Sequence, residues 1–223
     1  MKLVLTVVLV AGFVGCQSTG EKNVKLETPK DKVSYSIGHA VGNNLKKDSI
    51  SINSSAFLRG VLDASADSAQ RLMTDQQVQE TMRSFQTEMR NKQMEKIRSG
   101  GSAFLAENCK KPGVVTLPSG LQYKVITEGK GISPKASSTV TTHYSGRLVD
   151  GTEFDSSYKR GQPATFGCSG VIKGWTEALL LMKVGSKWEL CIPPELAYGE
   201  RGAGDVIPPN ATLVFDIELL SVK

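Results

Sequence analysis

The C-terminal half of the sequence gathers aromatic and branched residues between turn signals, but it nearly lacks the residues of covalent catalysis. One carboxylate, Asp155, and two phenols, Tyr144 and Tyr198, are interspersed with apolar side chains: Phe154, Phe166, Val171, Ile172, Trp175 and Phe215. Such a set could build a small apolar bowl with a few polar groups on its rim, which is typical of a ligand site. It contains no nucleophile–base pair. The chemistry it suits best breaks no covalent bond.

Four motifs in this half carry a family resemblance: THYSG at 142–146, DGTEFDSS at 150–157, VIKGW at 171–175 and IPPNATLVF at 207–215. They resemble the successive signatures of the FKBP-type peptidyl-prolyl isomerases in order and approximate spacing. KVSYSIG at 32–38 and LPSGLQY at 117–123 extend the resemblance to one branch, the dimeric outer-membrane lipoproteins called macrophage infectivity potentiators (Mip). The resemblance implies a foldase that isomerises X-Pro bonds of exported proteins without a cofactor.

The resemblance also assigns roles within the bowl. It implies that Asp155, the Tyr198 hydroxyl and the backbone N–H of Ile172 act on the substrate amide, while Arg160 supports Asp155. The implied substrate-binding residues are Tyr144, Phe154, Phe166, Val171, Trp175, Val206, Ile207 and Phe215, with Trp175 as the floor. The alternative is that these aromatic residues form an ordinary core.

Departures from the family pattern lie at one edge of the bowl. Ala164 and Ala203 stand where many relatives carry a phenylalanine and a histidine, and Asp205 adds a charge to the loop that flanks the pocket. We expect a shallower bowl that still binds proline-containing polypeptides and macrolide inhibitors such as rapamycin. A second class of function also fits the sequence, namely a dimeric chaperone or surface binding module for which turnover is not the main role.

Residues 1–15 are predicted to be a signal peptide. Lys2 precedes an apolar run from Leu3 to Val14 that is shorter than the ~20 residues of a membrane-spanning helix. The run ends before Cys16 in a sequence that resembles a bacterial lipobox, although Phe13 stands where leucine is usual. We expect lipidation of Cys16 and anchoring to the bacterial outer membrane, facing the periplasm or the cell surface. Ordinary cleavage, with Cys16 as a spare thiol, is the alternative.

Composition describes a globular chain with no cluster of charge. The 223 residues are 39% hydrophobic, and the net charge of +5 comes from basic residues interleaved with acidic ones. Nucleic-acid binding is disfavoured because it needs a clustered basic face. Two histidines and no Cys/His cluster predict no metal site. Beyond Cys16, an odd number of cysteines remains, Cys109, Cys168 and Cys191, so at most one intrachain disulfide is possible.

A polar tether at 16–29 leads into a helical region at 30–73. Val33, Ile37, Val41 and Leu45 recur every fourth residue, and a second stripe carries Phe57 and Val61. Helices this short cannot bury their apolar faces within one chain, because small domains bury too little surface to offset chain entropy. We therefore expect a homodimer through this region; folding back onto the C-terminal domain is the alternative.

A connecting helix is predicted at 74–110. Val78, Met82, Phe85 and Met89 form an apolar stripe, which we call the seam; beyond it the corresponding positions are lysines, which predicts a solvent-exposed spacer. Gly100-Gly101 should cost about 2 kcal/mol in a helix interior, so we expect the helix to bend or fray there as a hinge.

Residues 111–223 predict an α+β domain. Alternation of apolar and polar residues indicates strands around Tyr123, Tyr144 and Phe215, and the segment from Trp175 to Met182 predicts one helix. The family resemblance implies an FKBP-like half-barrel of antiparallel strands wrapped around that helix.

Overall fold

The computed structural model describes residues 24–65 and 70–223. These residues form two compact units that divide between Thr74 and Asp75. The predicted signal peptide, Cys16 and the first part of the tether lie outside the described residues. Among the helices within the described ranges, none is long and apolar enough to cross a membrane.

The first unit contains two amphipathic helices, as the apolar spacing predicts. Helix α1 spans Pro29–Lys47, and its N-terminus carries a capping box in which Thr28 and Asp31 satisfy each other's backbone N–H groups. Helix α2 spans Ser54–Ala64 and is capped by Asn53. Neither helix buries a residue within this chain. Large apolar side chains stay open to solvent on both helices: Val33, Ile37, Phe57, Leu58, Val61 and Leu62.

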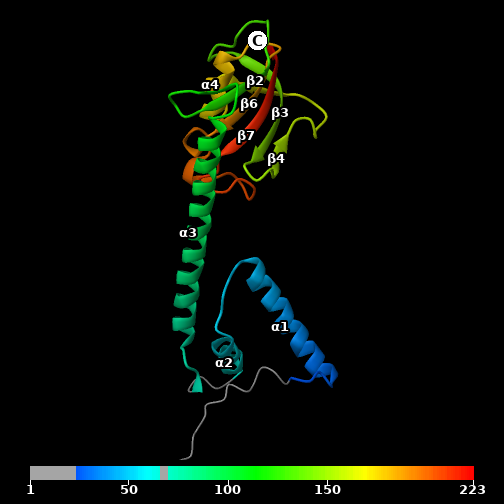
Figure 1. The fold of residues 1–223 in the computed structure, drawn as a ribbon, viewed down its shortest axis with the longest axis vertical. Helices are drawn as coiled ribbons and strands as arrows, with labels where there is room; N and C mark the ends of the chain where they lie inside the picture. Colours follow the sequence, from blue (N-terminus) through cyan, green and yellow to red (C-terminus); the bar gives the residue numbers. More distant parts are fainter. Residues whose placement is uncertain (1–23, 66–69) are drawn as a thin grey trace, which may run out of the picture. The chain divides into compact units, whose positions relative to one another are not determined.

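Helix α3 spans Asp75–Asn108 and belongs to the second unit (Figure 1). It runs through Gly100 and Gly101 without interruption, so the expectation that the helix frays at this pair is wrong. The reason is packing. Gly101 is buried, and a Cβ built on it would lie 2.4 Å from Thr212 Oγ1. Burial of the helix against the sheet domain offsets the weak helix propensity of the two glycines.

The second half of α3 is also less exposed than the sequence suggests. Met94, Ile97, Gly101, Leu105 and Asn108 are at least partly buried and recur at helical spacing. Ile97 packs against the hydrophobic core of the C-terminal domain. The prediction of a spacer that stands free in solvent is therefore wrong for the last four turns.

A seven-stranded antiparallel sheet forms the C-terminal domain. Its strands are β1 (Val114–Thr116), β2 (Gln122–Thr127), β3 (Thr139–Leu148), β4 (Glu153–Ser156), β5 (Ala164–Gly167), β6 (Lys187–Ile192) and β7 (Leu213–Val222). The order is β1-β2-β6-β7-β3-β4, and β5 also pairs with β3. This arrangement confirms the predicted α+β class.

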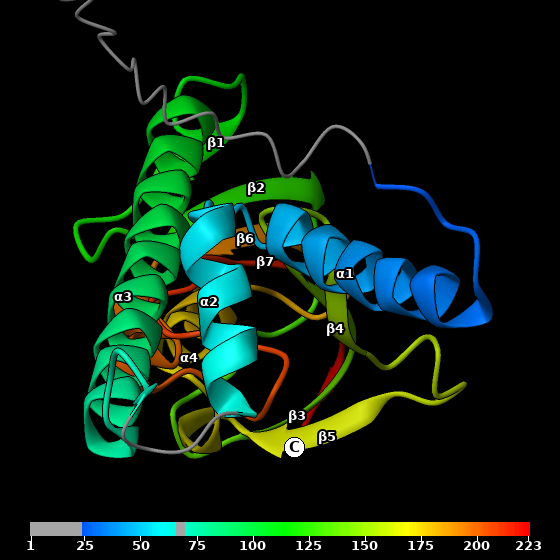
Figure 2. The same ribbon diagram turned by 90° about the horizontal axis from the view of Figure 1, so that it is seen from below.

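Helix α4, Lys173–Leu181, lies against the concave face of the curled sheet (Figure 2). Its Trp175, Ala178 and Leu179 join the core, whose sheet side is lined by alternate residues of β3 and β7 such as Val140 and Ile217. Gly174 permits the close approach, because a Cβ there would lie 2.6 Å from Ile192. This close packing at Gly174 fixes the N-terminal end of α4 against Ile192 of β6.

The cysteines of the described chain are unpaired: Cys168 and Cys191 are buried, and Cys109 is exposed. Burial raises the pKa of Cys191 to about 12. Within 24–65 and 70–223, no group of His, Cys, Asp or Glu side chains could hold a metal ion.

Candidate active site

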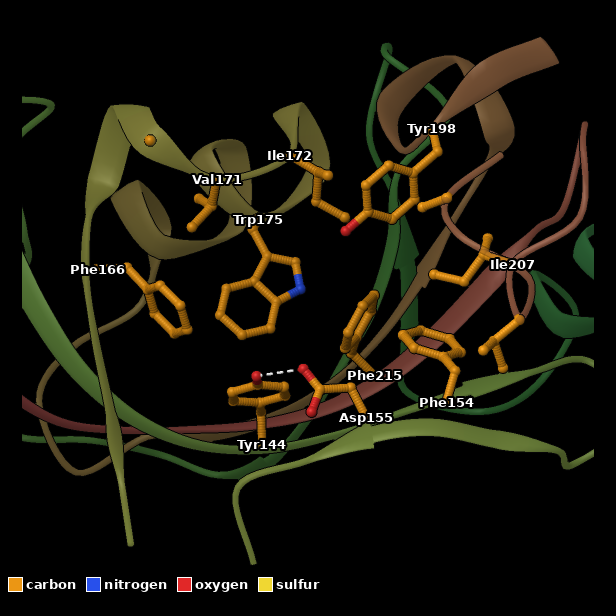
Figure 3. A pocket seen from close by; sticks show the side chains of 13 residues that line it. Tyr144, Phe154, Asp155, Phe166, Val171, Ile172, Trp175, Tyr198, Ile207 and Phe215 are labelled. Carbon is orange, nitrogen blue, oxygen red and sulfur yellow. Dashed lines mark hydrogen bonds between the residues drawn. The ribbon is translucent and has the colours of Figure 1, made fainter. Parts of the chain in front are cut away.

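A pocket of about 590 Å³ opens beside the N-terminal end of α4 (Figure 3). Every residue assigned above to catalysis or substrate binding lines it. The lining is Tyr144, Phe154, Asp155, Phe166, Gly170, Val171, Ile172, Trp175, Tyr198, Ala203, Val206, Ile207 and Phe215. Residues from β3, β4, β5, α4, β7 and two loops thus converge on one concave and mostly apolar surface.

Trp175 is the centre of an aromatic cluster. Tyr144, Phe166 and Phe215 meet it edge to face, with ring centroids 5.1, 5.7 and 5.3 Å away. Edge-to-face contacts are the preferred geometry of aromatic pairs and fix the orientation of each ring. Because Trp175 is only 4% exposed, its ring is a rigid floor for the pocket.

Phe154 and Phe215 pack close to Gly146 of β3, whose register partners are Asp155 of β4 and Phe215 of β7. Phe154 and Phe215 meet edge to face, with centroids 5.5 Å apart. A Cβ on Gly146 would lie 2.5 Å from Phe215 and 2.7 Å from Phe154, closer than side-chain atoms approach in folded proteins. A side chain at position 146 would push both rings toward the pocket.

The polar side of the pocket is built from Tyr144, Asp155 and Arg160. The Tyr144 hydroxyl donates to Asp155 Oδ2 at 2.5 Å (Figure 3). Arg160 forms an ion pair with Oδ1 of the same carboxylate. Arg160 Nη2 also donates to the Tyr144 hydroxyl at 2.8 Å. Arg160 does not line the pocket but holds both of these groups from outside it.

These contacts fix the protonation states. Burial raises the pKa of Asp155, but the hydrogen bond from Tyr144 and the interactions with Arg160 outweigh it and hold the pKa below its ordinary 3.8. Burial and the hydrogen bond to Asp155 raise the pKa of Tyr144 above its ordinary value. At neutral pH Asp155 is therefore a carboxylate and Tyr144 a neutral phenol.

Ile172 caps the N-terminal end of α4. Its carbonyl accepts the first helical bonds, from Trp175 and Thr176 at 3.0 and 3.1 Å. Its own N–H precedes the helix and is not used by the helical hydrogen-bond ladder. The Ile172 N–H, which lies next to Trp175 in the pocket lining, therefore makes no hydrogen bond within α4.

Tyr198 and Ile207 come from the long connection between β6 and β7. Ala203 and Ile207 exchange backbone hydrogen bonds of 2.9 and 3.1 Å, which closes a small loop. Gly202 is required in this loop because its φ is +65° and a Cβ would lie 2.3 Å from the Ile207 carbonyl. Tyr198 is 41% exposed, and its hydroxyl points into the pocket beside Ile172 (Figure 3).

The sequence did not indicate two lining positions, Gly170 and Ala203. Ala203 drew notice only as a departure, and Gly170 has no side chain that would mark it. A signal for both existed in their neighbours, since each lies within three residues of a predicted wall residue.

Two family models match the chain. The C-terminal one, FKBP-type peptidyl-prolyl cis-trans isomerase, matches residues 130–220, and a domain found amino-terminal to such isomerases matches residues 30–125. The outer membrane protein MIP of Legionella longbeachae is 49% identical over 89% of this chain and 88% of its own. The peptidyl-prolyl cis-trans isomerase Mip of Coxiella burnetii is 44% identical over 100% of this chain and 98% of its own.

A solved structure is similar over both units. The crystal structure of FkpA from Escherichia coli covers 89% of this chain and 99% of its own, at 39% identity and a TM-score of 0.67. Fold, pocket and sequence similarity together define a member of the two-part FKBP class with an N-terminal helical region. The chain belongs to the FKBP-type peptidyl-prolyl cis-trans isomerase family, and it is a peptidyl-prolyl cis-trans isomerase.

Proposed function

We propose that the pocket around Trp175 is the isomerase active site and that it lowers the rotational barrier of an X-Pro amide without covalent chemistry. The observation that carries this proposal is that the aromatic floor formed by Trp175 and the carboxylate of Asp155 line the same pocket. A proline ring is small and apolar, so it can pack on the face of the Trp175 ring. The residue roles below follow from this placement.

The barrier to rotation is about 20 kcal/mol because twisting the C–N bond destroys amide resonance. The planar amide is the more polar form, since resonance separates charge between its oxygen and nitrogen. An apolar site that excludes water therefore disfavours the planar ground state relative to the twisted transition state. Lowering the barrier by about 7 kcal/mol would give on the order of a 10⁵-fold acceleration.

In this proposal the polar groups orient the substrate while the prolyl amide turns. The Ile172 N–H and the Tyr198 hydroxyl donate to substrate carbonyls on either side of the proline. Asp155 faces the twisting carbonyl, and Arg160 with Tyr144 keeps its charge and orientation fixed. The walls formed by Phe154, Phe166, Val171, Val206, Ile207 and Phe215 exclude water from the proline.

The test is an isomerase assay on a short prolyl peptide. Asp155→Leu and Tyr198→Phe should each lower kcat/KM by a factor that corresponds to about 1–3 kcal/mol, without loss of fold. Asp205→Asn and Tyr158→Phe are matched controls: one removes an exposed charge beside the pocket, the other the hydroxyl of an exposed tyrosine in the turn after β4. Wild-type activity in both test variants, with unchanged circular dichroism, would remove Asp155 and Tyr198 from the mechanism.

The same pocket is proposed to bind macrolide inhibitors. Ala203 lines the pocket, and Ala164 is partly buried and packs against the core. Neither side chain adds bulk at the positions where many relatives carry a histidine or a phenylalanine. Competition between rapamycin and a prolyl peptide, followed by fluorescence, tests whether the two ligands share the site.

We propose a homodimer through the N-terminal helices. Large apolar side chains remain exposed on α1, α2 and the first turns of α3: Val33, Ile37, Phe57, Leu58, Val61, Leu62, Val78 and Met82. A second copy of the chain is the natural cover for such faces, because one short helical unit cannot bury them alone. Two pockets joined in this way would also hold a protein chain at more than one proline, which supports a chaperone role. In this proposal the protein acts as a chaperone or binding module as well as an isomerase.

We also propose lipid anchoring at Cys16 in the bacterial outer membrane. The lipobox-like sequence supports the anchor, and a relative named outer membrane protein MIP supports the location. Metabolic labelling with a palmitate analogue should mark the wild-type protein and not Cys16→Ser. Protease treatment of intact cells then decides between the periplasmic and the surface-exposed orientation.

A further inference from the structure

One face of α3 touches the catalytic domain at a position where a side chain cannot fit. Gly101 is buried between two exposed neighbours, Gly100 and Ser102. A Cβ at position 101 would lie 2.4 Å from Thr212 Oγ1 and 3.1 Å from Thr212 Cβ, whereas a Cβ at position 100 would meet nothing within 4 Å. The backbone of α3 and the Thr212 side chain are therefore in direct contact only because residue 101 is glycine.

Thr212 lies at the end of the segment that forms one wall of the pocket. It is 2% exposed and directly precedes β7, and Ile207 in the same segment lines the pocket. Between them, Asn210 adopts φ +60° and its N–H donates to the Gly199 carbonyl at 2.9 Å. Gly199 follows Tyr198. The segment 207–212 thus connects the contact between Thr212 and α3 to the wall residue Ile207 and, through the hydrogen bond from Asn210 to Gly199, to Tyr198.

The helix cannot relieve this contact by moving aside freely, because its last turn is fastened to the sheet. Asn108 Nδ2 donates to Gln122 Oε1 at 2.9 Å and to Cys191 Sγ at 3.3 Å, and Gln122 Nε2 donates to the Leu105 carbonyl at 2.9 Å. Asn108 and Gln122 are 3% and 5% exposed. Two strands, β2 and β6, therefore fix the helix backbone on the C-terminal side of Gly101.

We propose that Gly101 is a positioning residue for the isomerase: the close approach of α3 to Thr212 sets the place of Ile207 and Tyr198 in the pocket. The Gly101–Thr212 contact acts on the loop wall from outside, while Asp155 and Tyr144 are held by β3, β4 and Arg160. Disturbing it should consequently weaken peptide binding through the loop and leave the carboxylate side unchanged. This inference rests on the proposed prolyl site.

The test uses the full chain and a matched pair of glycine variants. Gly101→Ala and Gly100→Ala make the same chemical change one residue apart, and both add helix propensity. The Kd of a short Xaa-Pro peptide, followed by backbone amide shifts, should rise between about twofold and thirtyfold in Gly101→Ala, the range of a coupling carried through packed side chains. It should stay at the wild-type value in Gly100→Ala.

A second-site variant distinguishes positioning from general damage. Thr212→Ala opens a gap opposite Gly101 and should also raise the Kd, while the double variant Gly101→Ala/Thr212→Ala fills that gap and should bind better than either single variant. In Gly101→Ala, peptide-free amide shifts should change at residues 199, 203 and 207 and not at Asp155. If Gly101→Ala does not fold, Thr212→Ala alone carries the test.

Unchanged Kd values in the folded single variants would overturn the inference, as would a double variant no better than the worse single variant. Failure of the proposed site has a different signature. It would appear in the wild-type titration as peptide-induced shifts that avoid residues 155, 172, 198 and 207.

Discussion

At the scale of single residues, the pocket separates the group that carries charge from the groups that exclude water. Asp155 is the one carboxylate among the lining residues, and it accepts a hydrogen bond from Tyr144 and forms an ion pair with Arg160. Without these partners, burial would raise the pKa of this carboxyl. Arg160 therefore matters to the site although it does not line the pocket.

Replacing Arg160 should change the titration of Asp155. Burial raises the pKa of this carboxyl, and the hydrogen bond from Tyr144, the contacts with Arg160 and a backbone hydrogen bond from Ser156 bring it below 3.8. We expect Arg160→Leu to raise the pKa, because it removes the cation and leaves the burial. Lys159→Leu is the control, since Lys159 pairs with Glu153 at 2.7 Å instead. Carboxyl-carbon shifts measured against pH report each group separately.

The sign of the stability effect follows. A folded-state pKa below the unfolded value means that this carboxylate stabilises the fold above about pH 4 and that the contribution is lost as pH falls through the folded pKa. The acid limb of the wild-type stability curve should therefore lose its Asp155 component in Arg160→Leu. An Asp155 pKa that does not move in this variant would contradict the assigned role of Arg160.

Gly146 offers a second test at this scale. Gly146→Ala should force Phe154 and Phe215 out of their edge-to-face contact and lower kcat/KM, because the added methyl would overlap both rings. Gly167→Ala is the matched control in a neighbouring strand, where a Cβ would meet nothing within 4 Å. Equal activity of the two variants would show that ring placement does not limit the reaction.

At the scale of elements, α3 shows where sequence reasoning succeeds and where it stops. Short-range periodicity predicted α1, α2 and strands β2, β3 and β7, because side-chain spacing of 3.6 or 2 residues is visible directly in the sequence. The continuity of α3 was not predictable in this way. It depends on contacts of α3 with Thr212 and Gln122, which are distant in sequence. Helix propensity alone disfavours a helix at a glycine pair, and the sequence does not show the tertiary contact that offsets it.

The pocket was predictable for a different reason. Motifs at 142–157, 171–175 and 207–215 have a recognised order, so Asp155, Trp175 and Phe215 could be assigned without knowing their distances. Geometry that no motif encodes, such as the clearance at Gly101, required coordinates.

The attachment of α3 gives a prediction about stability. Asn108→Ala should lower the free energy of unfolding by about 1–3 kcal/mol, because it leaves the buried Gln122 oxygen without its donor. Glu107→Ala, one residue earlier, removes only a solvent-exposed pair with Lys110 and should have little effect. Denaturant unfolding measures both. A thiol reagent adds an independent readout: Cys191, whose pKa is about 12, should react faster in Asn108→Ala as α3 opens from the sheet.

At the scale of the whole molecule, the chain combines a complete catalytic unit with helices that have no cover within one copy. The C-terminal domain has its own core and pocket, whereas α1 and α2 bury no residue. In the proposed mechanism, catalysis on a short peptide needs only the pocket. The proposed dimer would therefore matter for substrates long enough to reach two pockets.

The last prediction tests that division of labour. If the seam of α3 is part of a dimer interface, Met82→Glu/Phe85→Glu should give a monomer. A dimer of this variant would have to bury unpaired carboxylates in the interface. Ser84→Glu/Thr87→Glu adds the same charge on the opposite side of the helix, at exposed positions, and should remain a dimer. Analytical ultracentrifugation determines the state of each protein.

The functional consequence should depend on substrate length. At equal pocket concentration the dimer should refold a proline-limited protein faster than the monomeric variant, because the second contact is effectively intramolecular. Both should isomerise a short peptide at the same rate, since a peptide reaches only one pocket and Met82 lies well outside the lining residues. A wild-type protein that sediments as a monomer, or equal refolding rates for the two forms, would leave the N-terminal helices without a role in substrate handling.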